Sequence, residues 1–287
     1  MANRHIIVGD VHGCLPELQA LVDAVALTRE DTLVFVGDLL DKGPDSAGVV
    51  RFVRGLSEDG FTVKLVKGNH EEKHERFRRA FAKAGDNVKM KGVAEMKAIT
   101  EALSDEDTAF LETAEVVVPV PGGVAIHAGV LPTTKTLDLK ALGKEAEMLM
   151  RVRHVTGKAV AKVTLEVVLV GDAAMSEDFT PDMLAEGQMV VVKKKVRPAG
   201  SFVSLGEETE EDPFWADVYD GRFGTVFFGH SPFTNEEAPV EFDHAVGLDL
   251  GAVFGNRLAA AVLSPDGSRS FVSVPSSGKF AKSFFED

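Results

Sequence analysis

Short apolar runs alternate with amphipathic segments in the first part of the chain. Residues 6–8, 32–36 and 61–66 are apolar, partly β-branched runs of strand length. Between them, residues 15–27 and 47–56 place leucines and valines at helical spacing. Pro16 suits a helix start, where the missing N–H of proline has no partner to lose. The order β-α-β-α-β predicts parallel strands in a layered α/β fold.

The remainder of the chain continues this pattern with one interruption. Helices are predicted at residues 91–111 and 137–150, and strands on both sides of Pro121-Gly122-Gly123 and at 225–228, 245–250, 258–263 and 270–274. The stretch 155–211 differs, because it combines β-rich runs at 163–170 and 189–196 with acidic loops. We therefore expect a single domain, residues 1–287, that carries a β-rich insertion or cap at 155–211.

Composition and charge limit the classes of function. The chain has 287 residues and a net charge of −14, which repels polyanions and argues against nonspecific nucleic-acid binding. Cys14 is the only cysteine, so an intramolecular disulfide is excluded, as fits a reducing compartment. No segment resembles a signal peptide or reaches the ~20 apolar residues that cross a bilayer. The expected location is the cytoplasm, without a membrane partner.

Polar side chains follow five of the predicted strands at the point where each ends. These side chains are Asp10 and His12, Asp38, Asn69 and His70, His127, and His230. Taken singly, a strand-end aspartate is often a helix cap, a Gly-Asn-His triplet is usually a turn, and a lone histidine is usually a satisfied polar residue. Binding sites in α/β folds lie beyond the carboxyl ends of strands, so these five ends can meet in one crevice.

This set of side chains suits transition metals. Carboxylate, amide and imidazole ligands without thiolate favour Mn, Fe or Zn and disfavour Ca or Mg. Two cations about 3.5–4 Å apart, bridged by a carboxylate and a hydroxide, form a clamp for in-line phosphoryl displacement. We expect two divalent metal ions, with Mn as first choice and Fe, Zn, Co or Ni as alternatives.

Five blocks around these strand ends occur in a fixed order. They are Gly9-Asp10-Val11-His12-Gly13, Gly37-Asp38 through Lys42-Gly43-Pro44, Gly68-Asn69-His70-Glu71, His127-Ala128-Gly129 and Gly229-His230. Together they resemble the phosphoprotein phosphatase superfamily of calcineurin-like metallophosphoesterases. The resemblance leaves residues 155–211 uncovered, and it implies a four-layer α-β-β-α sandwich. Protein phosphatases usually carry Asp-Arg-Gly where this chain has Asp41-Lys42-Gly43. The Lys42-Gly43-Pro44 form resembles the branch of symmetrical diadenosine tetraphosphatases.

The resemblance implies a role for each matched residue. Asp10, His12 and Asp38 would hold the first metal, and Asp38, Asn69, His127 and His230 the second. His70 would be the general acid, oriented by Asp41. Arg151 or Arg153 would hold phosphoryl oxygens; which of the two faces the phosphate is left open. Lys42, Asp249 and Arg257 are candidate substrate-binding residues, and a solvated turn is an equally good interpretation of Arg257.

Four further residues receive structural interpretations. His74 is expected on a solvated helix face, and Cys14 as a small buried residue. Phe214 and Trp215 favour core or cap packing over stacking on a base.

Three functions compete at this point. The first is hydrolysis of phosphoanhydrides, above all dinucleoside polyphosphates such as diadenosine tetraphosphate, to two ADP, by a metal-bridging hydroxide with His70 protonating the leaving oxygen. The second is a serine/threonine protein phosphatase that uses the same centre on a phosphoprotein. The third is a non-catalytic scaffold, which the intact set of ligands disfavours. The oligomeric state is not indicated by the sequence.

Overall fold

The first strand shows why this chain forms layers. The computed structural model describes residues 3–169 and 188–282. In β1 (His5–Val8), Ile6 and Val8 point into one hydrophobic cluster and Ile7 points into another, and all three are buried. Side chains alternate across a strand, so a strand that is apolar on both faces must lie between two other layers.

The first sheet has five strands in the order β12-β11-β1-β2-β3. The three predicted N-terminal strands run parallel, with His5 beside Thr32 and Thr32 beside Thr62. Of the two C-terminal strands, β11 pairs antiparallel to β1, and β12 pairs antiparallel to β11. The bounds of the added strands are β2 (Thr32–Phe35), β3 (Thr62–Leu65), β11 (Arg257–Leu263) and β12 (Arg269–Pro275).

The second sheet also has five strands, in the order β4-β5-β8-β10-β9. Parallel pairing joins β5 to β8 and β8 to β10, so the carboxyl ends of these strands lie at one edge. The bounds are β4 (Val117–Val120), β5 (Gly123–Ile126), β8 (Thr225–Phe228), β9 (Val240–Glu241) and β10 (Ala245–Gly247).

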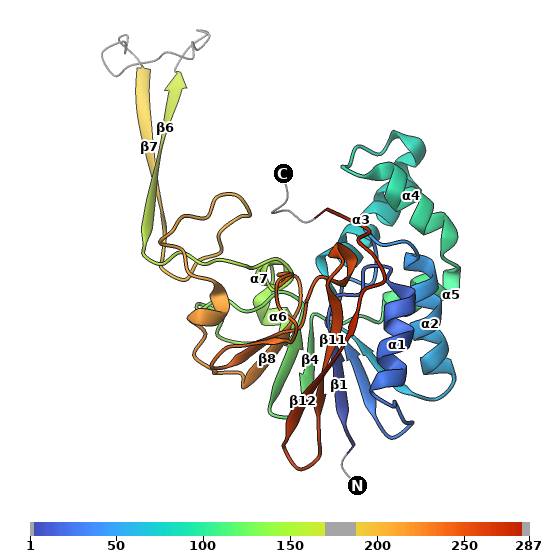
Figure 1. Cartoon of the computed structure of the whole chain (residues 1–287). Coiled ribbons are helices and arrows are strands. Elements are labelled where there is room, and N and C mark those ends of the chain that lie inside the picture. Colours follow the sequence, from blue (N-terminus) through green and yellow to red (C-terminus); the bar gives the residue numbers. More distant parts are fainter. Residues whose placement is uncertain (1–2, 170–187, 283–287) are drawn as a thin grey trace.

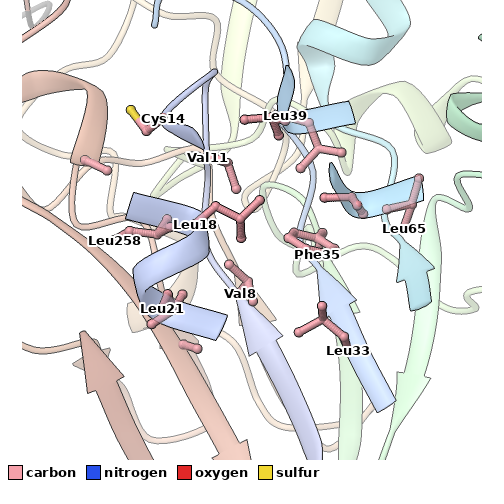
Figure 2. Close-up of a cluster of buried hydrophobic side chains, with 14 of the residues drawn as sticks. Val8, Val11, Cys14, Leu18, Leu21, Leu33, Phe35, Leu39, Leu65 and Leu258 are labelled. Atoms are coloured by element: carbon pink, nitrogen blue, oxygen red, sulfur yellow. The ribbon is translucent and has the colours of Figure 1, made fainter. Parts of the chain in front are cut away.

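Three hydrophobic clusters separate four layers. Helices α1 (Leu15–Ala24) and α2 (Ser46–Glu58) cover the outer face of the first sheet, where Leu18, Leu21 and Phe35 are buried (Figure 2). The two sheets pack on each other through a second cluster that includes Val34 and Phe227. The outer face of the second sheet packs on Trp215 and on the segment of α6 (Leu139–Leu142) and α7 (Glu145–Met148) (Figure 1). The predicted α-β-β-α sandwich is confirmed, and Trp215 is a core residue.

Three further helices come after β3 in the chain. They are α3 (Asn69–Ala84), α4 (Val93–Ala102) and α5 (Asp105–Leu111), and they lie together at one side of the molecule (Figure 1). Short 3-10 turns stand at Gly85–Asn87, Trp215–Asp217 and Ala252–Phe254. None of the helices within 3–169 and 188–282 is long and apolar enough to cross a membrane.

The prediction of one helix over 137–150 is wrong. Gly143 separates α6 from α7, with a φ of 53°, which a residue with a side chain rarely adopts. Periodicity alone continued the helix through this residue because apolar residues recur on both sides of it, with Leu139 and Leu142 before it and Met148 and Leu149 after it.

The stretch 155–211 contains an antiparallel pair, β6 (Val160–Leu169) and β7 (Gln188–Arg197). Figure 1 shows this ribbon extending away from the two sheets. Residues 170–187, which include the end of the predicted run 163–170, lie outside the described residues. The flanking segments return to the body, where Val155 and Phe202 form an isolated bridge.

Candidate metal centre

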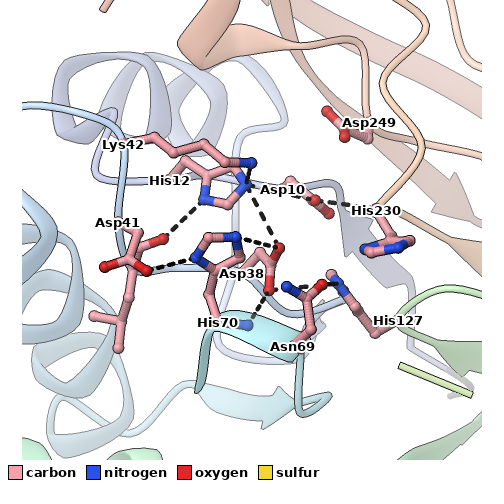
Figure 3. A network of polar contacts seen from close by, with 12 residues as sticks. Asp10, His12, Asp38, Asp41, Lys42, Asn69, His70, His127, His230 and Asp249 are labelled. Carbon is pink, nitrogen blue, oxygen red and sulfur yellow. Dashed lines mark hydrogen bonds and ion pairs between the residues drawn. The ribbon is translucent and has the colours of Figure 1, made fainter. Parts of the chain in front are cut away.

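Loops at the carboxyl ends of four strands and the start of α3 carry the predicted metal ligands. Asp10 and His12 follow β1, Asp38 follows β2, and Asn69 begins α3 after β3. From the second sheet, His127 follows β5 and His230 follows β8. Figure 3 shows all six side chains turned toward one another. All are buried except Asn69, which is half-buried.

Asp38 lies at the middle of the group. Its Oδ2 is 3.5 Å from His12 Nε2, and its Oδ1 is 3.4 Å from His127 Nε2. Two sets of ligand atoms come close enough to hold a cation, one of His12, Asp38 and His70, the other of Asp38, His127 and His230. Asp38 belongs to both sets, as the bridging role implied by the resemblance requires. Asp10 lies beside the first set, with Oδ2 3.9 Å from His12 Nε2.

Two glycines permit this close approach. A Cβ at Gly229 would collide with Asp10 Oδ1, and a Cβ at Gly68 would collide with Asp38 Oδ1. In these two blocks the glycine that precedes the ligand is therefore required by contact with a carboxylate from another block.

The donor atoms fit divalent cations. Nδ1 of His12 lies 2.8 Å from the carbonyl of Leu40, and Nδ1 of His127 lies 2.8 Å from the carbonyl of Val36. A carbonyl only accepts, so each Nδ1 carries a proton and each Nε2 is the ring nitrogen that faces the site. His230 Nε2 and Asp10 Oδ1 are buried and find no hydrogen-bond partner among the described residues. A bound cation would satisfy such buried acceptor atoms.

The pKa shifts of the ligand side chains also indicate a site that a cation would stabilise. Burial raises the pKa of Asp10 well above its ordinary value, and the charges of Asp249 and Asp38 raise it further. Burial also lowers the pKa of His12 and of His230 well below the ordinary value, with Lys42 and Arg153 respectively adding to the effect. These two imidazoles are therefore neutral, the form that binds metal. The site gathers carboxylates whose mutual repulsion a cation would remove.

Lys42 already places one positive charge at this centre. Its Nζ lies 2.8 Å from His12 Nε2 and 5.3 Å from the ring centroid of Phe254. Since His12 Nδ1 carries the proton, the ammonium donates to the Nε2 lone pair. A cation on that lone pair would require Lys42 to turn away, and the side chain also borders the pocket described below.

His70 and Asp41 form the dyad that the resemblance implied. His70 Nδ1 is 2.6 Å from Asp41 Oδ2, and His70 Nε2 faces the ligand group, 3.8 Å from Asp38 Oδ2. Burial by itself would raise the pKa of Asp41, but its bonds to His70 and His74 hold it far below the ordinary value. Lys73 Nζ also donates to Asp41 Oδ2, at 2.9 Å.

The prediction that His74 occupies a solvated helix face is wrong. Its side chain is fully buried, and its Nε2 donates to Asp41 Oδ1 at 2.6 Å. His70 and His74 stand one turn apart on α3, so both face the same carboxylate from the second block. The local composition of the helix is strongly polar, which hid this contact from the sequence.

The structure brings both arginines to the pocket beside the ligands. The pocket has a volume of about 360 Å³ and is lined by Lys42, Asn69, His70, Arg151, Arg153, Phe202, Ser204, Leu205 and His230. Arg153 donates to the carbonyl of His230 at 2.7 Å, and Arg151 pairs with Glu72 at 2.6 Å. Both arginines border the pocket, so which of them faces the phosphate stays an open question.

The two other candidates lie differently. Asp249 is buried beside the ligand group, where Figure 3 places it near His230, and its Oδ1 accepts the N–H of Gly251 at 2.9 Å. Arg257 lies on β11 and donates to Ser273 Oγ at 2.8 Å, and it is not among the residues that line the pocket.

Sequence reasoning missed Glu71 as a member of the site. This buried carboxylate accepts the N–H groups of Asp38 at 2.7 Å, Leu39 at 2.8 Å and Gly68 at 3.0 Å. It thereby fixes the second block against the third. Its place in Gly68-Asn69-His70-Glu71 was a signal, but only one of the three donors is close in sequence.

Comparison with known proteins agrees with this geometry. Residues 4–148 match the sequence profile of the calcineurin-like phosphoesterases. The chain belongs to this family. It is therefore a hydrolase of phosphoesters or phosphoanhydrides, and family membership implies the use of divalent metal.

Relatives of this calcineurin-like phosphoesterase carry two related names. It is 30% identical over 272 residues to the bis(5'-nucleosyl)-tetraphosphatase PrpE [asymmetrical] of Bacillus velezensis, covering 88% of this chain and 86% of that protein. It is 27% identical over 269 residues to the bis(5'-nucleosyl)-tetraphosphatase, symmetrical, of Erwinia tasmaniensis, covering 88% and 91%.

Two solved structures share the fold. A crystal structure of a candidate diadenosine tetraphosphatase is 25% identical, with a TM-score of 0.61 and coverage of 96% and 94%. A serine/threonine phosphatase from Saccharomyces cerevisiae is 13% identical, with a TM-score of 0.51 and coverage of 100% and 82%, and shows the fold alone.

Proposed function

We propose that this protein hydrolyses the phosphoanhydride bonds of dinucleoside polyphosphates such as diadenosine tetraphosphate. The proposal rests on one observation: three cationic side chains, Lys42, Arg151 and Arg153, line the pocket that lies beside the metal-ligand atoms. A tetraphosphate bridge carries several negative charges and needs more cations than a single phosphate group. In a chain with a net charge of −14, such a pocket provides a local field of the opposite sign.

The proposed centre holds two divalent cations, with Mn as first choice. The residues that would hold them are Asp10, His12, Asp38, Asn69, His127 and His230. Bound cations would supply Lewis-acid stabilisation of the phosphoryl charge and a nucleophilic hydroxide at neutral pH. The arginines would bind phosphoryl oxygens, a task that suits the planar guanidinium with its paired donors.

His70 is proposed to protonate the leaving oxygen. Asp41 fixes the ring through Nδ1 at 2.6 Å, which leaves Nε2–H of the protonated ring free to donate toward the pocket that His70 borders. Asp41 is itself held by Lys73 and His74, so the ring has one available orientation. A general acid must present its proton at a fixed atom, and this arrangement meets that requirement.

The named relatives support a nucleotide substrate. Two proteins called bis(5'-nucleosyl)-tetraphosphatase, one under the asymmetrical and one under the symmetrical name, align with this chain over 86% and 91% of their length. Cleavage to two ADP, which the Lys-Gly-Pro form of the second block favours, is the finer part of the proposal.

One comparison of substrates tests the proposal. With Mn²⁺ present, kcat/KM is measured for diadenosine tetraphosphate and for a phosphoserine peptide, and products are separated by chromatography. Preference for the nucleotide with ADP as product is the expected result. Preference for the peptide would favour a serine/threonine phosphatase, and ATP with AMP would refute symmetrical cleavage.

A variant tests the role of His70. His70→Asn should lower kcat strongly while bound metal, measured by elemental analysis, remains. Full activity in this variant would exclude His70 as the general acid.

A further inference from the structure

A second cavity shares a wall with the catalytic pocket. This side cavity has a volume of about 400 Å³ and is lined by Leu131, Thr133, Glu145, Met148, Ser201, Phe202 and Ser204. Phe202 and Ser204 also line the catalytic pocket. One short segment, residues 201–205, therefore borders both spaces.

The shared wall is anchored to the segment that carries the arginines. Thr156 donates its N–H to the carbonyl of Ser201 at 2.9 Å, and Val203 donates to the carbonyl of His154 at 3.1 Å. Arg153, the residue before His154, reaches the carbonyl of the metal ligand His230. The side cavity is thus held in a fixed position relative to the phosphate-binding side chains.

The two spaces differ in chemistry. The catalytic pocket is lined by Lys42, Arg151 and Arg153, whereas no basic side chain is among the described residues that line the side cavity. The side cavity instead presents the aromatic ring of Phe202, the thioether of Met148 and the apolar Leu131. These groups suit the face of a flat heterocycle.

Its polar groups also select against phosphate. Thr133, Ser201 and Ser204 offer hydroxyls, and Glu145 offers a carboxylate that accepts a hydrogen bond from Thr134 Oγ1. A carboxylate repels a phosphate but accepts from ribose hydroxyls or an exocyclic amine. A volume of about 400 Å³ falls within the range of small-ligand sites, ~300–1,000 Å³.

We propose that the side cavity binds one nucleoside of the substrate, base and ribose together, while the attached phosphates occupy the catalytic pocket. This inference rests on the proposed function and adds a specificity site to it. The segment 201–205 would then be the point where the substrate passes from its apolar end to its charged end. Phe202 contacts both spaces and would pack against the nucleoside.

The test fills the cavity without touching the metal ligands. Thr133→Trp places a large ring at an exposed residue that lines the side cavity, and Lys135→Trp places the same ring on the same loop at an exposed residue outside it. For both variants and the wild type, kcat/KM is measured with Mn²⁺ for diadenosine tetraphosphate and for p-nitrophenyl phosphate, which has no nucleoside. Phe202→Ala is a second variant that removes the ring itself.

We expect Thr133→Trp to lower kcat/KM for diadenosine tetraphosphate by about tenfold or more, the worth of one stacked base. Hydrolysis of p-nitrophenyl phosphate should stay within about twofold, and Lys135→Trp should leave both substrates unchanged. Equal losses on both substrates, or no loss on either, would overturn the subsite. A wild-type protein that cleaves p-nitrophenyl phosphate but not diadenosine tetraphosphate would instead overturn the proposed function, so the two failures are distinguishable.

Discussion

Replacing Glu71 with glutamine tests how the second and third sequence blocks are joined. The carboxylate accepts three backbone N–H groups, from Asp38, Leu39 and Gly68, at 2.7, 2.8 and 3.0 Å, and it is buried. Glutamine has nearly the same shape, but one of its two terminal atoms is a donor. That donor must face at least one of the three N–H groups, whichever way the amide is turned.

The magnitude follows from the number of bonds lost. A hydrogen bond to a charged group contributes about 1.5–3 kcal/mol, and a buried donor without a partner costs about 1–3 kcal/mol. Glu71→Gln should therefore lower the free energy of unfolding by about 3 kcal/mol. With a denaturant slope of about 3 kcal/mol per molar, the urea midpoint should fall by about 1 M.

The assay is urea unfolding followed by circular dichroism, together with the metal content of the folded protein. Metal content should fall as well, because Asp38 and Asn69 are positioned through the same junction. Glu101→Gln is the matched control, since Glu101 is 65% exposed and only 4.0 Å from Lys97. A urea midpoint of Glu71→Gln equal to that of the control would refute the reasoning.

Three further outcomes are expected. His74→Phe should lower kcat on p-nitrophenyl phosphate by about 10–100-fold, the usual cost of losing a group that orients a site residue. His74→Gln, which still donates to Asp41, should retain more of the activity. Equal rates in the two variants would contradict this role. Burial alone would raise the pKa of Asp31, but hydrogen bonds from Arg4 and Thr28 lower it. The stability that these bonds contribute is therefore present above the ordinary carboxyl pKa, and it is lost as the pH falls below that pKa. Arg4→Met should therefore destabilise the fold by about 1 kcal/mol at pH 7 and less at pH 3, measured by thermal unfolding, and an equal loss at both pH values would refute the assignment. Chelation with EDTA should abolish activity and lower Tm, because the folded protein loses the stabilisation that bound metal provides. The free energy of unfolding should fall by about 3 kcal/mol if the metal had been at 100 times its Kd. An unchanged Tm would argue against a bound cation in the folded protein.

The sequence predicted the layers and the ligand group because both depend on short-range patterns. The apolar run of β1, whose side chains alternate between two hydrophobic clusters, and the motif that follows it lie within a few residues of each other. The break at Gly143 was lost because the helical pattern on either side has the same period, and only the backbone angle of 53° separates α6 from α7.

His74 and Glu71 could not be assigned for a different reason. Their partners are far away in the chain: Asp41 lies 33 residues from His74, and Asp38 lies 33 residues from Glu71. A polar helix indicates a solvated face unless the contact across the fold is known. The strand-end motifs place residues near one another, but they do not state which backbone groups those residues satisfy.

Backbone strain at the centre had no sequence signal either. Six non-glycine residues in the described part of the chain have positive φ, and five belong to the site: His12, Asp38, Asp41, Lys42 and His230, with φ between 45° and 68°. Each such residue costs about 1–2 kcal/mol, so surrounding contacts must hold it. For two of them buried hydrogen bonds do so: the N–H groups of Asp38 and its neighbour Leu39 donate to Glu71, and the N–H of His230 donates to Asp10 Oδ2. The same contacts that turn these residues into the left-handed region therefore aim their side chains at one point, which is why substitution of a residue that binds no metal is expected to disturb the metal centre.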